Sequence, residues 1–459
     1  MLRLSWTQPE DLLPHAFVAA ELDGRDAADL RERWIAAGGA PTAPVNGATP
    51  QPAPEQLRRL ARDLLAELDG RPDPAELVAA EPDDLEAILA AAPAAAGTQT
   101  AGSAPMGSAG TDAYADRVLG AWRGRAAGCL LGKPVEKLPL EGIRAIARST
   151  GNWPIASYFT AVGLDPEIAA RYPWNRRSRP TSLVENIDGM PEDDDLNFPL
   201  IALQLLESAG RAFTTDAVAQ AWLDALPGGR VFTAERITYR NLLDGYEPEV
   251  AGRVRNPFRD WIGAQIRTDV YGWATPGDPV AAARLAWADA RLSHGRNGVY
   301  GAMFAAAACS AAVAGASLDR VLDAGLSVVP SGSRYAAAVT RGAELGASDL
   351  DDEAAVDALH AEFGHLHWVH VLNNAALLAF ALTRGGGAFE RTIALAVSGG
   401  WDTDSVGATA GSIAGALTGA TGLPERWIAP LHDRLATSVP GFSDVRFSEL
   451  ARRTEAVAA

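Results

Sequence analysis

The chain has 459 residues, of which 48% are hydrophobic and 21% are charged, and its formal net charge is −17 at pH 7. This composition is typical of a globular protein in water, and the length allows one large domain with an additional region. The acidic balance argues against nucleic acid as a bulk partner, because phosphate binding needs Lys and Arg. With only two cysteines and no apolar signal sequence at the start, we expect a cytoplasmic protein without disulfides.

Residues 1–95 predict an N-terminal helical appendage. Leucines recur at helical spacing, with charges between them, in segments 27–37, 54–68 and 74–92. The appendage contains no recognisable set of catalytic residues, and its sequence does not identify a binding partner. Residues 96–111 are rich in Gly, Ala, Ser and Thr, which predicts a flexible linker. The main domain is therefore expected at residues 112–459.

The first helix of that domain is predicted at residues 114–131, where many small residues allow close helix packing. It ends in Gly132-Lys133, which suggests a P-loop, but the required first glycine and the final hydroxyl residue are missing. Glu136 follows a Gly/Pro break. It is either a carboxylate on a loop at the mouth of a cleft or an ordinary surface residue.

A run of four acidic residues, Glu192 to Asp195, comes next. Leucines at helical spacing follow it, so the acids lie at or just before a helix N-terminus, where the helix dipole tolerates negative charge. Adjacent carboxylates repel one another, and burying them without partners costs several kcal/mol per charge. The run is therefore either a solvated helix cap or a cation site.

The segments between the two acidic runs of this sequence predict further helices. Residues 256–269 mix aromatic and polar groups and are a candidate substrate wall, and His294 lies in a Gly-containing turn, where it contacts a ligand or caps the next helix. The Ala-rich stretch 301–316 is too short to span a bilayer, so no membrane partner is expected. His365, His367 and His370 do not share one helix face and have no Cys nearby, which disfavours zinc. No segment alternates as strands do, which predicts an all-α fold.

The second acidic run is Gly399-Gly400-Trp401-Asp402-Thr403-Asp404-Ser405. Its Asp-x-Asp spacing points two carboxylates at one hard cation, and the following serine adds a hydroxyl. Mg²⁺ and Mn²⁺ prefer such oxygen ligands. Two matched runs favour a metal site over two unrelated helix caps. Glycines then recur every four residues from 407 to 419, which allows close contact with another helix.

Four blocks of the sequence resemble the ADP-ribosylglycohydrolase family: residues 128–136, 192–195, 263–267 and 399–405. The resemblance covers residues 112–440 and none of the appendage. It implies a compact, multi-helix domain with two Mg²⁺ ions, or Mn²⁺, at the base of a cleft that receives ADP-ribose. The metal ligands implied by the motifs are Glu192, Asp193, Asp194, Asp402, Asp404 and Ser405.

The same resemblance, together with the residue patterns above, gives the other expected roles. Glu136, Asp194 and Asp404 are the expected catalytic carboxylates, since one of them assists proton transfer. The expected substrate-binding residues are Arg267, His294, Asn297, Gly399, Gly400 and Trp401.

The sequence also departs from the family pattern. Cys129 stands where the family usually has Asp, and the usual Thr-Asp-Asp-Thr is replaced by Glu192 to Asp195, which adds two carboxylates. The resulting hypothesis is a Mg-dependent hydrolase of a ribosyl bond, acting on an ADP-ribosylated side chain or a small nucleoside-like metabolite. One alternative is a non-catalytic ADP-ribose-binding or structural relative. The other is a terpene-synthase-like, Mg-dependent lyase, to which the second acidic run is a poor match.

Overall fold

The computed structural model describes residues 3–93 and 109–459, and every regular element in these ranges is a helix. The β-contacts found there are isolated bridges, such as that between Met190 and Leu435. The predicted all-α fold is confirmed. The predicted linker lies mostly outside the described residues, which omit 94–108.

The appendage contains α1 (Pro9–Leu22), α2 (Ala28–Ala36), α3 (Glu55–Asp69), α4 (Ala75–Ala80) and α5 (Leu85–Ala91). The next part of the chain contains α6 (Asp112–Gly132), α7 (Leu140–Ser149), α8 (Pro166–Arg171), α9 (Arg179–Ser182), α10 (Asp194–Ala209), α11 (Thr215–Ala225), α12 (Thr233–Leu243), α13 (Pro248–Ala251), α14 (Asp269–Trp273) and α15 (Pro279–Ala290). The last part contains α16 (Arg296–Val313), α17 (Leu318–Leu326), α18 (Arg334–Ala347), α19 (Asp352–Phe363), α20 (Val371–Gly385), α21 (Phe389–Ser398), α22 (Thr403–Thr418), α23 (Glu425–Ile428) and α24 (Phe447–Ala458). Six short 3₁₀ helices connect them: η1 (Lys133–Val135), η2 (Gly210–Ala212), η3 (Gly228–Arg230), η4 (Ile262–Arg267), η5 (Ala420–Gly422) and η6 (Ala429–Leu431).

Helical spacing located α2 and α3 to within one residue at each end. The expected helix at 74–92 is instead two helices, because residues 81–84 leave the helical path and Asp84 caps α5 through its side chain. The sequence pattern did not reveal α1, in which Pro14 and His15 interrupt the leucines and the polar residues Glu10 and Asp11 are buried.

Helices α6 and α22 form the closest helix pair of the fold. They run antiparallel, and their glycines face one another in register: Gly120 with Gly415, Gly124 with Gly411, and Gly128 with Gly407. A Cβ atom on any of these six would overlap a backbone carbonyl oxygen of the other helix. The contact ends where Thr403 donates a hydrogen bond of 2.8 Å to the carbonyl oxygen of Gly132. The end of α6 is thereby fixed against the start of α22.

The Ala-rich helix α16 lies at the centre of the domain, with all 18 of its residues buried. Cys129 and Cys309 are both buried and unpaired. Among the described residues, no helix is long and apolar enough to cross a membrane.

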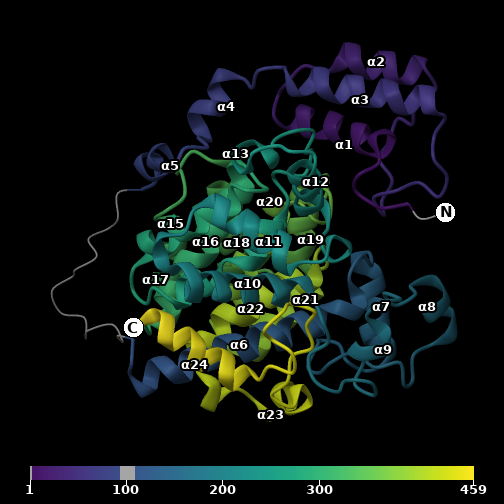
Figure 1. Ribbon diagram of the computed structural model, residues 1–459. Coiled ribbons are helices and arrows are strands. Elements are labelled where there is room, and N and C mark those ends of the chain that lie inside the picture. Colours follow the sequence, from purple (N-terminus) through teal and green to yellow (C-terminus); the bar gives the residue numbers. More distant parts are fainter. Residues whose placement is uncertain (1–2, 94–108) are drawn as a thin grey trace.

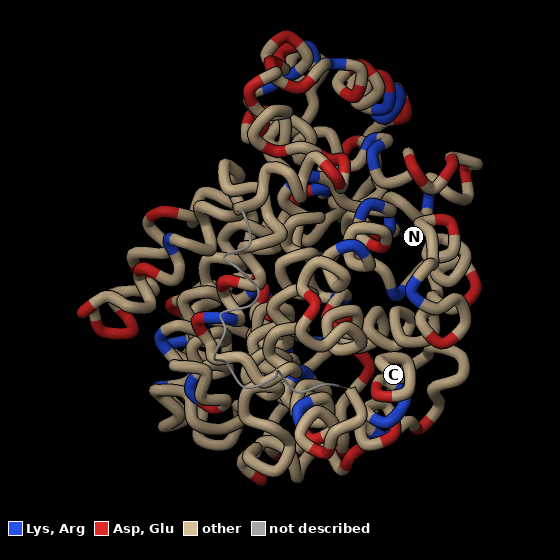
Figure 2. The backbone as a smooth tube through the Cα atoms, turned by 90° about the vertical axis from the view of Figure 1, so that its left-hand side faces the viewer, with Lys and Arg blue, Asp and Glu red and all other residues tan. Residues whose placement is uncertain are grey.

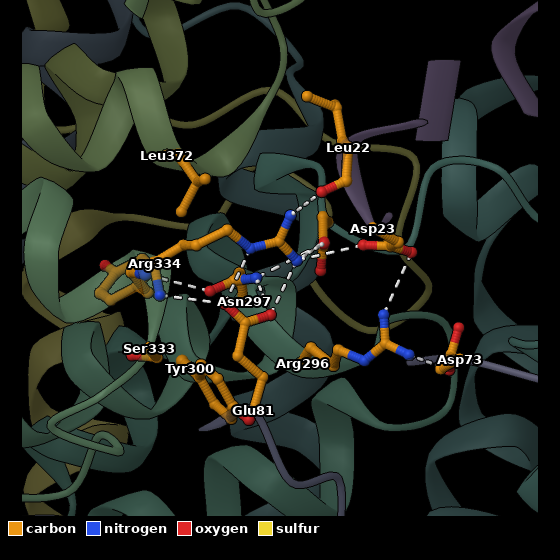
Figure 3. A network of polar contacts seen from close by, with 12 residues as sticks. Leu22, Asp23, Asp73, Glu81, Arg296, Asn297, Tyr300, Ser333, Arg334 and Leu372 are labelled. Atoms are coloured by element: carbon orange, nitrogen blue, oxygen red, sulfur yellow. Dashed lines mark hydrogen bonds and ion pairs between the residues drawn. The ribbon is translucent and has the colours of Figure 1, made fainter. Parts of the chain in front are cut away.

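The appendage packs on one end of the main domain, with α1, α2 and α3 together and α4 and α5 running down the side (Figure 1). Buried polar contacts hold it there. Glu81 accepts from Asn297 at 2.8 Å and pairs with Arg334 at 2.7 Å, and Arg334 also pairs with Asp23 at 3.1 Å (Figure 3). The appendage and domain therefore share a polar interface, in which a single arginine of α18 pairs with two acidic residues of the appendage.

Candidate functional site

An open cleft of about 470 Å³ lies where the N-termini of α10 and α22 meet the segment that follows α6. Both acidic runs line it, and basic and aromatic residues surround them. The lining includes Trp6, Lys133, Glu136, Lys137, Asn175, Arg177, Glu192, Asp193, Asp194, Asp195, Arg230, Phe232, Trp368, Asp402, Asp404 and Ser405. The fixed contact between α6 and α22 thus brings two distant parts of the sequence into one site.

The first acidic run begins α10. Asp193 is the N-cap residue, and its carboxylate accepts a hydrogen bond of 2.9 Å from the backbone N–H of Asp195. The same carboxylate forms a buried ion pair with Lys133. A cap of this kind satisfies an otherwise free N–H group and suits the positive end of the helix dipole.

Asp195 faces the interior rather than solvent. The hydroxyl of Ser405 donates to its Oδ2 atom at 3.3 Å, and Cys129 Sγ lies 3.9 Å from the same oxygen. Its Oδ1 atom is 3.5 Å from the guanidinium of Arg125 but accepts no hydrogen bond within the described part of the chain. Asp195 was not among the expected metal ligands, yet it connects the first acidic run with the second.

The second acidic run meets Glu136 at the other side of the cleft. Oxygen atoms of Glu136, Asp402 and Asp404 all lie within 4.8 Å of one another. Asn175 donates to Glu136 at 2.6 Å, and Lys137 pairs with it at 2.9 Å. The loop after α6 therefore places this carboxylate beside the start of α22. Of the two roles that the sequence left open for Glu136, this position corresponds to the carboxylate at a cleft.

Two groups of side chains in the described residues have a spacing that suits a metal ion. They are Cys129 with Asp193 and Asp195, and Glu136 with Asp402 and Asp404. The second group offers three carboxylates, the donors that hard divalent cations prefer. In the first, burial raises the pKa of the Cys129 thiol well above its ordinary value, so it stays protonated and leaves the two aspartates as donors. The residues present therefore fit divalent cations bound through oxygen.

The electrostatics of the site reflect this crowding of acids. Burial, reinforced by Glu136 and Asp193, raises the pKa of Asp404 to about 7. Burial and neighbouring aspartates also raise the pKa values of Asp194, Asp195 and Asp402 well above the ordinary value. For Asp193, burial alone would raise the pKa, but the charge and hydrogen bond of Lys133 outweigh it and lower the pKa. One carboxylate is thus balanced by lysine while the others are not.

Comparison with known proteins agrees with these motifs. The sequence model of the ADP-ribosylglycohydrolase family matches residues 110–457. The chain belongs to the ADP-ribosylglycohydrolase family. An uncharacterised protein of Archaeoglobus fulgidus is 28% identical over 315 residues, which are 68% of this chain and 90% of that protein. A solved structure of an ADP-ribosylglycohydrolase-related protein complex aligns with a TM-score of 0.44 and 23% identity, over 76% of this chain and 97% of the other.

Two of the positions at which the sequence departs from the family pattern, Cys129 and Asp195, lie in contact. The Cys129 sulfur is 3.9 Å from an Asp195 oxygen.

Glu192 occupies the rim of the cleft. Its carboxylate pairs with Arg230 at 2.9 Å and accepts hydrogen bonds from Asn197 at 3.1 Å and from the backbone N–H of Ser438 at 3.0 Å. Burial would raise its pKa, but these partners outweigh it and lower the pKa. Glu192 thus already has three partners, whereas Asp194 and Asp402 have no ion pair among the described residues.

Three of the expected substrate-binding residues lie outside the cleft lining. Arg267 is 1% exposed and pairs with Glu235 at 2.9 Å, so it stands behind a cleft residue. His294 is buried, and its ring contacts Ser293 at 2.7 Å. Asn297 is fully buried and donates to Glu81 of the appendage. These side chains form the internal polar contacts of the domain and its interface, which a sequence motif alone does not distinguish from ligand contacts.

The expected substrate-binding segment 399–401 lies beneath the second acidic run rather than on the cleft surface. Gly400 and Trp401 have positive φ angles of 80° and 59°, and the Trp401 ring stacks on His360 with 4.2 Å between centroids. A positive φ is unfavourable for tryptophan, so surrounding contacts must hold it. His360 helps by contacting the carbonyl oxygen of Gly399 at 2.7 Å. The segment forms the turn that aims Asp402 and Asp404.

Several cleft residues carry no recognisable signal in the sequence. Lys133 lies in a Gly-Lys pair that resembles only part of a P-loop, and its place directly after α6 puts it near Glu136. Trp6 comes from the appendage and reaches the cleft because Arg236 donates to the carbonyl oxygen of Ser5 at 3.1 Å. No local signal in the sequence indicates that contact.

We expect the stability of the metal-free protein to fall as pH rises through about 7. Asp404 has a raised pKa in the folded state, so it folds in its neutral form, and the stability it contributes is present below its unfolded pKa and is lost above the folded one. The check is the melting temperature in EDTA between about pH 5 and pH 8. In the Asp404→Asn variant, the melting temperature should change less over this pH range. Equal pH profiles for both proteins would contradict the assignment.

Proposed function

We propose that this chain is a Mg-dependent hydrolase that cleaves a ribosyl glycosidic bond of the ADP-ribosyl type. The observation that carries the proposal is the convergence of five buried or half-buried aspartates and Glu136 at the base of one cleft. Family membership supports glycosyl hydrolysis as the reaction class. The substrate class is an ADP-ribosylated side chain or a small nucleoside-like metabolite.

Asp193, Asp194 and Asp195 on one side of the cleft, and Asp402, Asp404 and Glu136 on the other, are the residues that would hold Mg²⁺ or Mn²⁺, with Ser405 between them. When bound, such ions supply Lewis-acid and template chemistry for hydroxyl groups of the ribose and for a water molecule. Glu192, which we expected as a ligand, is proposed instead to order the rim through Arg230.

The chain's own groups suit the remaining parts of the reaction. Hydrolysis adds water to the anomeric carbon and transfers a proton to the departing group, so it needs a carboxylate beside the cleft. Glu136 is oriented by Asn175 and Lys137. Arg177 and Arg230 line the rim, where they can pair with phosphate oxygens, and the rings of Phe232 and Trp368 can cover an aromatic group. The positive charges of the two rim arginines thus offset the negative charge at the base of the cleft.

The test is a hydrolysis panel in Mg²⁺ and in Mn²⁺, read by mass spectrometry. The substrates are ADP-ribosyl-arginine, ADP-ribosyl-serine, ADP-ribose oligomers and free nucleosides. We expect cleavage of at least one of them, dependent on the metal and abolished by EDTA. Absence of metal-dependent cleavage across the panel, at protein concentrations that bind the substrates, would reject the hydrolase proposal.

Glu136→Gln should lower turnover by about 10²–10⁴-fold, the usual contribution of a general acid or base. The amide keeps the hydrogen-bonding shape of Glu136 but cannot exchange a proton, so KM should change much less than kcat. The measurement is steady-state kinetics on the best substrate of the panel. Glu425→Gln serves as the matched control, because Glu425 is exposed and does not line the cleft, so kcat should stay unchanged. Loss of binding with unchanged kcat would instead assign Glu136 to substrate contact.

A second candidate function rests on Lys133. Its ammonium group is buried in the acidic site and paired with Asp193, so it already neutralises part of the charge that a cation would balance. Burial would lower the pKa of Lys133, but the charge of Asp193 outweighs it and raises the pKa, so the lysine stays charged. This arrangement favours a non-catalytic ADP-ribose-binding relative. Such a protein would bind ADP-ribose without turnover and would show the same affinity in EDTA and in Mg²⁺.

A further inference from the structure

A second cavity, of about 570 Å³, lies between the appendage and the main domain. Its walls are formed by α1 and segments 43–45 and 68–73 of the appendage, and by segments 250–261, 295–296 and 365–370 of the domain. It lies behind the acidic cleft. Trp6 of the cleft contacts Trp261 and His367 of the cavity, with ring centroids 5.6 Å and 6.2 Å apart. No residue of either acidic run lines it, so the two cavities are distinct.

Three arginines, Arg25, Arg259 and Arg296, gather in this cavity, and two aspartates neutralise them only in part. Arg296 pairs with Asp23 at 3.1 Å and with Asp73 (Figure 3). Arg25 lies 3.6 Å from Asp23 and 3.3 Å from Asp73, and its Nε atom is buried without a hydrogen bond. Within residues 3–93 and 109–459, the Arg259 side chain forms no hydrogen bond or ion pair. Arg259 is therefore the one member of this cluster that lacks an ion-pair partner among the described residues.

Other charged groups of the cavity wall have additional partners. Arg71 pairs with Asp29 at 2.7 Å. Asp69 accepts from the backbone N–H of Arg255 at 2.6 Å, and its carboxylate also feels the charges of Arg259 and Arg25. Asp260 lies 3.5 Å from Arg334, and its charge also acts on Arg296. Basic and acidic residues are interleaved where the appendage meets the domain (Figure 2). Burial lowers the pKa of Arg25, and the positive charge of nearby Arg259 lowers it further, as expected for like charges held together.

The cavity lining also contains apolar residues and histidines. Val18, Leu22 and Trp261 provide the apolar surface. His15 and His367 also line the cavity, and the Nε2 atom of each is buried without a hydrogen-bond partner in the described ranges. Burial lowers the pKa of His15 to about 4 and that of His367 to about 3, so both rings are neutral. An unpartnered buried ring nitrogen is costly unless a ligand or water meets it.

We propose that this cavity binds a small organic anion. Its phosphate or carboxylate group would lie against Arg25, Arg259 and Arg296, and its body would lie against the apolar residues with a polar atom reaching His15 or His367. Arginine groups in a fixed arrangement are well suited to such oxyanions. The volume falls in the usual range for small-molecule sites, about 300–1,000 Å³. Among the described residues, neither group with metal-ligand spacing contains a residue of this cavity.

The test is isothermal titration calorimetry of the full chain in EDTA and low salt, with phenyl phosphate, benzoate and inorganic phosphate as probes. We expect phenyl phosphate or benzoate to bind once per chain and more tightly than inorganic phosphate, because the ring adds apolar contact. Comparison of the first two probes identifies the preferred acid group. Failure of all three to bind at millimolar concentration overturns the proposal.

Arg259→Gln locates the site. This change removes no internal hydrogen bond or ion pair of the described residues, so folding should be preserved, and affinity should fall by at least about tenfold. Arg284→Gln, which alters a surface pair with Glu86, is the matched control and should bind as the wild type does. Asp404→Asn should also retain binding. If Asp404→Asn abolishes binding and Arg259→Gln does not, the anion occupies the acidic cleft and the proposal is wrong.

Discussion

Asp404→Asn should lower activity on the best substrate by about two orders of magnitude or more, the scale expected when a site loses its main electrostatic element. Asp404 belongs to the group with Glu136 and Asp402, and its charge also acts on Lys133 and on Asp194 across the cleft. Asparagine keeps the shape of the side chain and removes its charge. The measurement is kcat/KM at saturating Mg²⁺, together with the Mg²⁺-dependent rise in melting temperature, which should shrink in parallel.

The matched control is Asp349→Asn. Asp349 is an exposed aspartate with no contact to the cleft, so the same change in net charge there should leave activity and metal response unaltered. Near-normal turnover of Asp404→Asn would mean that the acidic runs serve only as helix caps. If both variants lose activity to the same extent, the cause is the change in net charge rather than the loss of a residue of the site.

Gly128→Ala should destabilise the fold by at least about 2 kcal/mol, which is large for the addition of one methyl group. The new Cβ would overlap the carbonyl oxygen of Gly407, and backbone atoms cannot rotate away as side-chain ends do. Helices α6 and α22 would have to separate, although alanine itself favours helix by roughly 1 kcal/mol over glycine. The measurement is urea unfolding monitored by circular dichroism.

Gly332→Ala provides the control for this prediction. A Cβ at Gly332 would meet no atom within 4 Å, and its φ is not positive, so stability should change by less than about 0.5 kcal/mol. The Gly128 variant should also lose part of its stabilisation by Mg²⁺, because Asp402 and Asp404 depend on the position of α22. If Gly128→Ala unfolds at the same urea concentration as the wild type, the two helices are not in close contact in solution.

Much of the fold and of the acidic site could be predicted because the signals are local. Helical spacing marks α2 and α3 to within one residue at each end. Paired acidic runs at helix N-termini indicated Asp193, Asp194, Asp402 and Asp404, and the structure places all four in one cleft. These features depend on residues close together in the sequence, so a single chain is sufficient to reveal them.

The partners of individual polar side chains could not be predicted in the same way. Asn297 and Arg334 bind Glu81, and Trp6 reaches the cleft from the appendage. Arg267 lies in a motif block yet pairs with Glu235 in the interior. These contacts join residues far apart in the chain, and nothing in the local sequence distinguishes a polar side chain that holds two parts of a protein together from one that holds a ligand.

The pairing of α6 with α22 has a consequence for biosynthesis. Thr403 and Gly132, which meet at the base of the site, are 271 residues apart, and Asp402 and Asp404 leave the ribosome long after Asp193 and Asp194. A protein is made from its N-terminus, and contacts of large sequence separation form late. Glu136 and the first aspartates must therefore remain without Asp402 and Asp404 while the intervening helices are synthesised. The proposed metal site can therefore form only after Asp404 has been synthesised.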